Sequence, residues 1–281
     1  MSDWFRQDET LTSVAIDDRG FQYGDGLFET IAVRHGTPRL WELHVDRLAA
    51  GCERLGLETP DATGMRRSLD AAIAAASTDP AYCVAKIIVT GGVTQRGYGR
   101  PPAAPASLYF GVFPSAPQPE KAYREGVATM RCNTRLAVGS ATAGLKTLNR
   151  IEQVLARSEC LARDVFEGLT FDAEGRLICG TMSNVFLVRE NDIVTPSLSR
   201  CGVRGVMRRH VVETLRATEQ TVTTCDLGED ELLGADEVFL SNSQFGLLPV
   251  RTCGDATWPA GPVTREVMDL LANAGIDECR L

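Results

Sequence analysis

Apolar residues recur along the chain with a helical period in some segments and alternate in others. Leu43, Leu48 and Leu55 repeat near helical spacing, which predicts a helix over 42–55 that ends before Gly56. The segment 149–163 places its apolar residues on one helical face. Helices are also predicted over Met65–Ala76, Val203–Ala217 and Val263–Ala272.

Alternating and β-branched runs predict strands between these helices. Phe28–Arg34 alternates, and the turn His35–Pro38 is expected to return the chain along Arg39–Trp41. Val84–Thr90 is typical of a buried strand. Further strands are predicted over Val14–Ile16, Ser107–Phe113, Val127–Arg131, Gly168–Phe171, Arg176–Ile178, Val185–Val188, Ile193–Thr195, Val222–Thr224, Glu237–Ser241 and Leu247–Val250. The order of elements favours an α+β fold with many hairpins over a doubly wound parallel sheet.

A proline-rich polar stretch, PSAPQPEK at 114–121, is the best candidate for a linker. We therefore predict a smaller N-terminal α/β domain over 1–114, a linker over 115–122 and a larger C-terminal α/β domain over 123–281. A glycine- and proline-rich loop, GGVTQRGYGRPPAAP at 91–105, is too long for a hairpin turn. Loops of this length in compact domains are often functional.

Composition and charge exclude several classes of protein. The 281 residues are 44% hydrophobic and 23% charged, which is ordinary for a globular enzyme. Lys+Arg 29 minus Asp+Glu 37 gives a net charge of −8, and no basic run occurs, so nucleic acid is not an expected partner. No apolar stretch approaches the roughly 20 residues of a membrane span, and the polar start MSDWFRQDET does not look like a signal peptide. We expect a cytoplasmic protein without a membrane partner.

The cysteines and histidines do not form a metal or disulfide pattern. The 9 Cys are scattered and odd in number, without a C-x-x-C pair, and the 3 His lie far apart. We expect no metal, and reduced thiols that act as small hydrophobic residues, with the exception of Cys179.

Lys146 is the candidate for chemistry that the residues themselves suggest. Lys86, Lys121 and Lys146 are the three lysines, and Lys146 lies in AGLKTLNRIEQ between an apolar lead-in and a helix. Desolvation there would lower the pKa of the amine and make it a nucleophile or base. A lone lysine before a helix is more often a solvated surface residue.

A set of segments in fixed order favours a reactive Lys146 over a solvated surface lysine. DRGFQYGDGLFET, ELHVDRL, AGLKTLNRIEQVLARSE, GTMSNVFLV, TPSLSRCGVRGVMR and LSNSQFGLLPV run from about Ile16 to Val250. In combination they resemble the fold-type IV pyridoxal-phosphate enzymes, the class IV aminotransferase family. RGYGRPP, LKTLNRIEQVLARSE and GTMSNVFLV are most similar to its aminodeoxychorismate lyases. The resemblance implies a two-domain fold like that of D-amino-acid aminotransferase, pyridoxal 5'-phosphate at the domain interface, a small-molecule substrate and a homodimer.

The resemblance assigns cofactor roles to individual residues. Lys146 would hold the cofactor covalently and later move protons, and Arg47 would bind the cofactor phosphate. Val203 and Arg204, after Gly202, would offer backbone N–H groups at a helix start, because the threonine common in the family is absent at Arg204. The remaining cofactor contacts that it implies are Asn184, Ser243 and Gln244, with Asn242 beside them.

Other residues would face the substrate. Phe28, Glu29 and Thr30 are expected on the substrate side, with Thr30 assigned to catalysis. Arg96, in the glycine-rich loop, would bind a substrate carboxylate, and Tyr98 in the same loop would contact the substrate. An exposed arginine on a surface loop is an equally good interpretation of Arg96.

One departure from the family bears on the reaction. Most members have a glutamate five residues before the asparagine that matches Asn184, paired with the pyridine nitrogen, and this chain has Cys179 there. A neutral thiol is a weak partner and makes a weaker electron sink. We expect a lyase that converts 4-amino-4-deoxychorismate to 4-aminobenzoate and pyruvate in folate synthesis, since aromatisation helps to drive that reaction. An aminotransferase acting on branched-chain or D-amino acids, and a weakened cofactor-binding homologue, stay open as alternatives.

Overall fold

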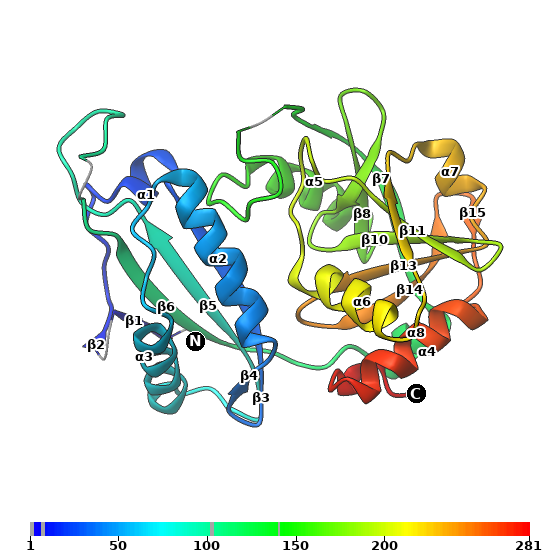
Figure 1. Cartoon of the computed structure of the whole chain (residues 1–281), viewed down its shortest axis with the longest axis horizontal. Helices are drawn as coiled ribbons and strands as arrows, with labels where there is room; N and C mark the ends of the chain where they lie inside the picture. The colour runs from blue at the N-terminus through cyan, green and yellow to red at the C-terminus, as the bar shows by residue number, and fades with distance from the viewer. Residues whose placement is uncertain (1–2, 7–8, 102–103, 140) are drawn as a thin grey trace. The chain divides into compact units, whose positions relative to one another are not determined.

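The chain divides into two compact units. The structure is a computed structural model that describes residues 3–6, 9–101, 104–139 and 141–281 (Figure 1). The first unit comprises Met1–Ala116 together with Leu145–Asn149, and the second comprises Pro117–Gly144 and Arg150–Leu281. Residues 102 and 103 of the predicted glycine-rich loop lie outside the described residues. Within the described part of the chain, no helix is long and apolar enough to cross a membrane.

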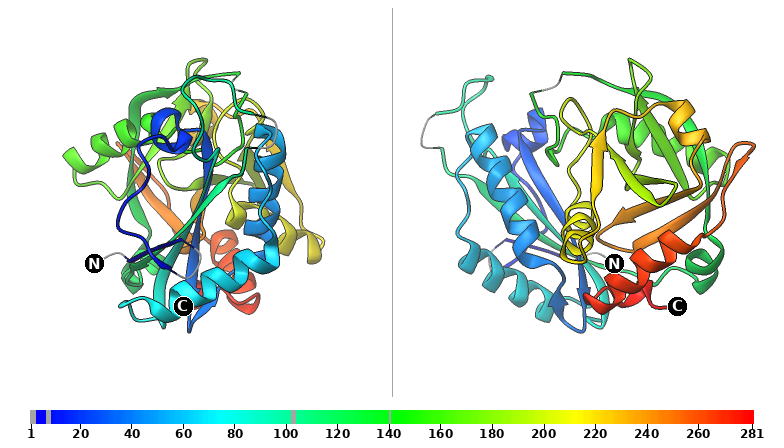
Figure 2. Two further views of the ribbon diagram at one scale, coloured as in Figure 1. Left: turned by 90° about the vertical axis from the view of Figure 1, so that its left-hand side faces the viewer. Right: turned by 45° about the vertical axis from the view of Figure 1, so that its right-hand side comes forward.

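The first unit is a six-stranded sheet with helices on one face. The strand order is β2-β1-β6-β5-β3-β4, and every pairing is antiparallel. Its elements are β1 (Asp3–Arg6), β2 (Glu9–Thr10), α1 (Arg19–Tyr23), β3 (Gly26–Arg34), β4 (Thr37–Pro38), α2 (Trp41–Leu55), α3 (Ala62–Ala75), β5 (Tyr82–Thr90) and β6 (Ser107–Pro114). Helices α2 and α3 cover the same face (Figure 2). Their Leu48 and Leu69 pack on Ile31 and Ile87 of the sheet.

The short segment 145–149 extends the edge of β3. The Phe28 N–H donates to the Lys146 carbonyl at 3.0 Å, and the Leu148 N–H donates to the Gly26 carbonyl at 3.0 Å. Thr147 forms an antiparallel bridge with Leu27. Backbone pairing therefore places Lys146 beside β3.

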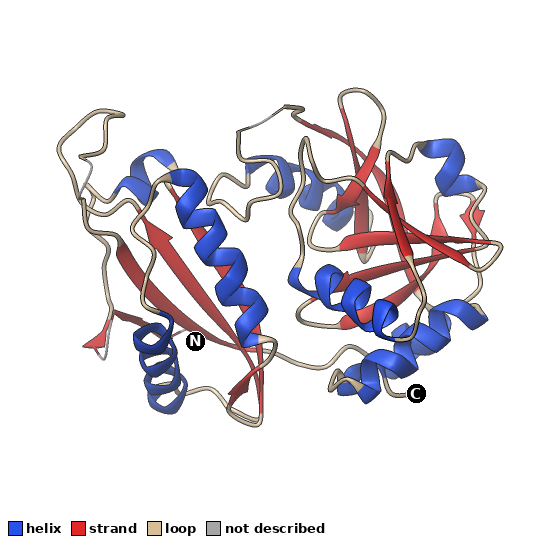
Figure 3. Ribbon diagram, viewed as in Figure 1, coloured by secondary structure: helices blue, strands red, loops and turns tan. Residues whose placement is uncertain are grey.

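The second unit is built on a nine-stranded mixed sheet (Figure 3). The strand order is β12-β11-β10-β13-β14-β7-β8-β9, and β15 pairs with β14. Its strands are β7 (Val127–Leu136), β8 (Glu167–Asp172), β9 (Leu177–Gly180), β10 (Asn184–Arg189), β11 (Asp192–Pro196), β12 (Val222–Cys225), β13 (Glu237–Asn242), β14 (Gly246–Cys253) and β15 (Ala256–Thr257). Its helices are α4 (Glu120–Glu125), α5 (Ile151–Ala162), α6 (Val206–Ala217), α7 (Glu229–Leu233), α8 (Pro262–Asn273) and the 3-10 turn η1 (Asp277–Cys279). Strand β8 is buried throughout, and β10 and β13 are buried except at their last residue, so these strands lack the alternation of a half-exposed sheet.

Most predicted elements are confirmed, but several differ in place: α3 begins at Ala62 rather than Met65, and β7 continues to Leu136 rather than ending at Arg131. Val14–Ile16 is an exposed irregular segment, because it has no strand partner. The return strand after the first hairpin is Thr37–Pro38 rather than 39–41, since Trp41 already begins α2. The helix predicted from Val203 begins at Val206, after Gly205. The mixture of hairpins and helices confirms the α+β class.

Candidate active site

The Lys146 amine lies against an aromatic ring of the first unit. Its Nζ is 4.3 Å from the centroid of the Phe28 ring, and the side chain is half-buried. An ammonium over a ring face is attracted by the ring's quadrupole. The structure therefore places Lys146 and Phe28 together.

Lys86 is a second amine at the same ring, and sequence reasoning missed it. Its Nζ is 4.8 Å from the Phe28 centroid, and burial lowers the pKa of Lys86. Lys86 on β5 is paired in register with Thr30 on β3. Because strand residues alternate, Thr30 and Phe28 share one face of the sheet. A lysine inside the apolar run 84–90 was the available signal.

Glu29 lies on the opposite face of β3, beneath α2. Its carboxylate accepts from Nε of Arg47 at 2.8 Å and from Nη2 of the same guanidinium. It also contacts Nδ1 of His44 at 2.5 Å. Burial alone would raise the pKa of Glu29, but the charges and hydrogen bonds of Arg47 and His44 lower it to about 2. Glu29 therefore orients Arg47 and does not line the face of Phe28 and Thr30, where the sequence placed it.

His44 is held as a neutral imidazole. It is 1% exposed, and burial is the main reason why its pKa is lowered. A carboxylate only accepts hydrogen bonds, so Nδ1 of His44 carries the proton that is shared with Glu29. Nε2 then presents a lone pair, and it is buried with no hydrogen-bond partner among the described residues.

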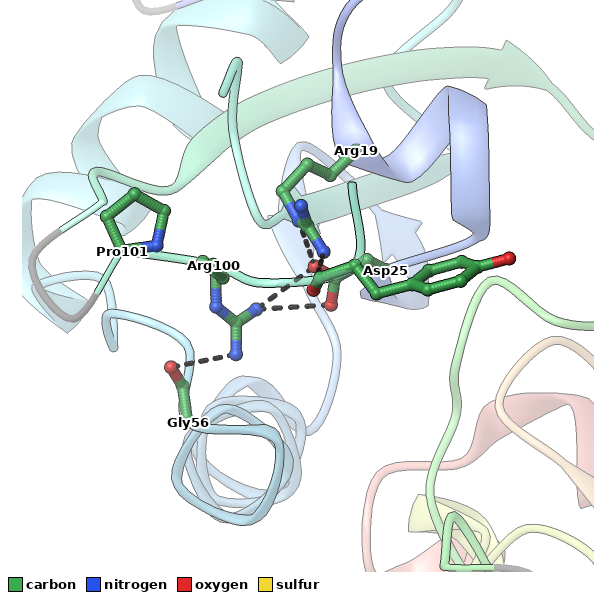
Figure 4. Close-up of a pocket in the computed structure, with 6 residues that line it drawn as sticks. Arg19, Asp25, Gly56, Arg100 and Pro101 are labelled. Atoms are coloured by element: carbon green, nitrogen blue, oxygen red, sulfur yellow. Dashed lines mark hydrogen bonds and ion pairs between the residues drawn. The ribbon is translucent and has the colours of Figure 1, made fainter. Parts of the chain in front are cut away.

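Arg96 and Tyr98 lie on the glycine-rich loop of the first unit, and both are exposed. Tyr98 is 88% exposed, with its ring 5.4 Å from that of Tyr23. Arg19 binds the backbone carbonyls of Gly97 and Tyr98 in this loop, and Arg100, near the end of the loop, binds Asp25 (Figure 4).

Cys179 is a buried, protonated thiol in β9 of the second unit. Its pKa is raised to about 11, chiefly by burial, and its Sγ is 3.5 Å from the Thr170 hydroxyl. It packs with Ile178 and Cys201 in an apolar cluster. Such a group provides no negative charge near neutral pH.

Asn184 connects the start of β10 to the turn before α6. Its Nδ2 donates to the Val203 carbonyl at 3.0 Å. A Cβ on Gly205 would lie 2.0 Å from Oδ1 of Asn184, so the close approach of this turn requires glycine. The Arg204 N–H is already used, because it donates to the Gly144 carbonyl at 3.0 Å. This corrects the prediction that Arg204 offers a free backbone donor.

Helix α6 begins at Val206, three residues after Val203, where the sequence predicts its start. Gly205 is its cap residue and has no side-chain hydrogen bond, and the first bond within the helix runs from Arg209 to Gly205. The N–H groups of Val206, Met207 and Arg208 therefore precede the helical ladder and suit an anion. The physical reason for the shift is that 202–204 pair with Gly144 instead of coiling.

Ser243 and Gln244 form the turn between β13 and β14. Oδ1 of Asn242 accepts from the Gln244 N–H at 2.8 Å and the Phe245 N–H at 3.0 Å. Nδ2 of Asn242 donates to the Met182 carbonyl at 3.3 Å. Ser241 is paired in register with Asn184, so this turn and the 182–184 segment are neighbours at one end of the sheet.

Glu167 organises that segment, and sequence reasoning did not identify it. It is completely buried in β8 and accepts from Thr181 Oγ1 at 2.5 Å and from Ser183 Oγ at 2.7 Å. It also accepts from the backbone N–H groups of Thr181 and Met182. A buried carboxylate satisfied in this way fixes the turn that leads into Asn184.

The sequence of this chain matches the profile of a known family. Residues 26–253 match the sequence profile described as amino-transferase class IV. The chain belongs to the class IV aminotransferase family. The match spans both units and includes every residue assigned above to the cofactor or to the substrate.

Individual relatives are similar to this chain over almost its whole length. It is 36% identical over 261 residues, 91% of this chain and 94% of the relative, to an aminodeoxychorismate lyase of Vibrio harveyi. It is similar to the crystal structure of 4-amino-4-deoxychorismate lyase from Pseudomonas aeruginosa, with 42% identity, a TM-score of 0.88 and coverage of 97% and 99%. A hypothetical aminotransferase from Mycobacterium tuberculosis, in a PLP-bound form, has the same fold, with 23% identity, a TM-score of 0.80 and coverage of 98% and 99%.

Proposed function

We propose that this chain is a pyridoxal-phosphate-dependent lyase that converts 4-amino-4-deoxychorismate to 4-aminobenzoate and pyruvate. The observation that carries the proposal is the half-buried Lys146 amine against Phe28, in a chain that resembles two lyases of this name over nearly its full length. The aminotransferase relative is less similar, at 23% identity. The lyase is therefore preferred to the aminotransferase.

The residues present fit the cofactor. Lys146 supplies the amine that holds its aldehyde carbon. Arg47 is held by Glu29 as an oriented guanidinium, and guanidinium groups bind phosphate through charge-assisted hydrogen bonds. We assign the phosphate also to the N–H groups at the start of α6, to Val203, and to the Ser243–Gln244 turn. Asn184 holds the turn before α6 in place through its hydrogen bond to the Val203 carbonyl.

The reaction needs a base and an acid at the substrate. When bound, pyridoxal phosphate supplies the electron sink for the carbanion. The Nζ of Lys146, free of the cofactor once substrate is bound, removes the proton from the amine-bearing carbon. The carbon–oxygen bond to the enolpyruvyl group then breaks, and the Lys146 ammonium returns a proton to the leaving group. Thr30, on the same sheet face as Phe28, is assigned to this proton transfer.

Cys179 favours elimination over transamination. A thiol whose pKa is raised to about 11 stays neutral and does not stabilise a positive charge on a ring nitrogen. The cofactor is then a weaker electron sink. Elimination tolerates a weaker sink because formation of an aromatic product helps to drive it. Transamination has no such driving force.

The substrate carries two carboxylates, and cations are available to bind them. Lys86 adds an amine at the ring that Lys146 also contacts. Arg96 is an exposed guanidinium on the loop. We assign carboxylate binding to these two side chains, with Phe28 and Tyr98 as apolar contacts.

Product analysis with enzymatically generated aminodeoxychorismate tests the function. The reaction is run with and without added pyridoxal phosphate, and 4-aminobenzoate and pyruvate are both measured. Equal amounts of the two products, dependent on the cofactor, are expected. Absence of both products, with conversion of an amino donor and 2-oxoglutarate instead, would assign the chain to the aminotransferases.

The location and the oligomeric state of the enzyme are also proposed. We infer a cytoplasmic enzyme of folate synthesis that acts as a homodimer, with two domains joined near 115–122. Light scattering at low protein concentration measures the oligomeric state.

A further inference from the structure

Two arginines and one aspartate tie the glycine-rich loop to the start of β3 (Figure 4). Arg19, 4% exposed, donates from Nε to Oδ2 of Asp25 at 2.6 Å. Asp25 also accepts from Nη1 of Arg100 at 3.1 Å. Asp25 directly precedes the first residue of β3, the strand of Phe28 and Thr30. One carboxylate thus joins α1, the loop and that strand.

The Arg19 guanidinium also holds the loop backbone. Its Nη1 donates to the Gly97 carbonyl at 2.9 Å, and its Nη2 donates to the Tyr98 carbonyl at 2.8 Å. The Gly97 N–H in turn donates to the Tyr23 hydroxyl at 3.2 Å. These contacts fall on the two residues that follow Arg96, so they fix the backbone from which its side chain extends.

Arg100 holds the end of the same loop. Its Nη2 donates to the Gly56 carbonyl at 3.0 Å and to the Leu55 carbonyl, both at the end of α2. The loop is therefore attached to α2 at one place and to α1 at another. Arg96, which directly precedes the first of these places, is exposed, and among the described residues no atom beyond the chain neighbours lies within 4 Å of a Cβ built on Gly99.

We propose that Arg19 and Asp25 are positioning residues that hold Arg96 at a fixed place relative to Phe28 and Thr30, and so set the affinity for the substrate carboxylate. This rests on the proposed function, in which Arg96 binds a carboxylate. Arg19 and Asp25 act through the loop and do not themselves touch substrate. A guanidinium suits the task because its planar fork serves the carboxylate and both carbonyls together, which an ammonium does not.

Amide hydrogen exchange of the loop tests the attachment without any substrate. Arg19→Lys and Asp25→Asn are compared with wild type, and Arg66→Lys is the control, since Arg66 pairs with Asp70 on the exposed side of α3. Exchange of 94–99 is expected to rise about tenfold in the two test variants and to stay unchanged in the control. Equal thermal midpoints for the remainder of the protein separate local loosening from misfolding.

Steady-state kinetics test the action through Arg96. Arg19→Lys is expected to raise KM for aminodeoxychorismate about tenfold, with kcat within about twofold, because only substrate positioning is impaired. Arg19→Lys combined with Arg96→Gln should be no worse than Arg96→Gln alone, since the two residues act as one unit. Additive losses, or a fall in kcat at constant KM, would overturn the proposal.

The two proposals fail in different ways. Unchanged loop exchange in both test variants overturns the positioning role, whether or not the wild type forms 4-aminobenzoate. A wild type without turnover overturns the proposed function, and loop exchange then decides whether Arg19 and Asp25 hold the loop.

Discussion

Glu29 of β3 and Arg47 of α2 form a two-pronged ion pair in the interior of the first unit. The carboxylate is fully buried, and it accepts from both Nε and Nη2 of the guanidinium. The pair fixes the plane of Arg47, so the guanidinium needs little reorganisation to meet a phosphate. A lone helical arginine would lose side-chain entropy on binding the same anion.

Replacing Glu29 should destabilise the protein in a pH-dependent manner. The ordinary pKa of 4.5 falls to about 2 in the folded state, which corresponds to about 3 kcal/mol. A carboxyl with a lowered pKa contributes fully above its unfolded pKa, and the contribution is lost as pH falls toward the folded value. We expect Glu29→Gln to lower the free energy of unfolding by about 3 kcal/mol at pH 7.

Urea unfolding at several pH values measures this difference. The gap between wild type and Glu29→Gln should be constant above about pH 5 and should narrow below about pH 4. Glu53→Gln, at an exposed position of α2, is the matched control and should leave the curve unchanged. A gap that does not depend on pH would contradict the ion pair as its origin.

Lys146→Ala should abolish the chemistry and leave the fold intact. Turnover is expected to fall about a thousandfold or more, because both the covalent hold on the cofactor and the proton carrier are lost. The visible absorbance of the bound cofactor should disappear as well. Lys121→Ala removes a side chain that is 77% exposed and should behave as wild type. Wild-type turnover in the Lys146 variant would refute the assignment.

Lys86→Met should weaken substrate binding more than catalysis. Methionine keeps the length and apolar stem of the side chain but removes the charge, so we expect KM to rise about tenfold and kcat to change little. Burial lowers the pKa of Lys86, so this amine loses its charge at a lower pH than an ordinary lysine does. KM of the wild type should therefore begin to rise at a lower pH than at a site built on an ordinary lysine. Equal KM values in wild type and variant between pH 7 and pH 10 would remove Lys86 from the substrate site.

Gly205→Ala should disturb the turn before α6. The new Cβ would lie 2.0 Å from Oδ1 of Asn184, which would push Asn184 away from the Val203 carbonyl. We expect the affinity for pyridoxal phosphate to fall about tenfold, as measured by titration of the cofactor-free protein. Gly99→Ala, where no atom lies within 4 Å, is the control. Unchanged affinity in Gly205→Ala would separate this turn from cofactor binding.

Cys179→Glu should alter the balance between two reactions. A carboxylate at this position would favour a protonated ring nitrogen and hence transamination. We expect conversion of amino donors to appear, with lyase turnover within about threefold of wild type in both Cys179→Glu and the neutral control Cys179→Ser. A gain in lyase turnover of about a hundredfold in Cys179→Glu would instead show that the natural site is weakened. Burial of the new carboxyl should also lower the thermal midpoint.

The sequence was most informative where the structure depends on neighbours along the chain. The helix over 42–55 and the strand over 84–90 were correctly predicted, because their apolar periods report one buried face. Val14–Ile16 was wrongly predicted as a strand, since a β-branched run needs a partner strand and none pairs with it. The start of α6 was wrong by three residues because Arg204 bonds to Gly144, sixty positions earlier.

The sequence by itself determined the family and the presence of a thiol at Cys179, and it identified Lys146 as the candidate for the reactive lysine. Each depends on residue types in a fixed order, which the chain carries directly. Tertiary structure alone decided that Lys86 shares the Phe28 ring with Lys146, that Glu29 binds both Arg47 and His44, and that Arg19 holds the loop of Arg96. The physical reason is that strand register and side-chain burial set these contacts and the pKa values of their groups, and spacing along the chain specifies neither.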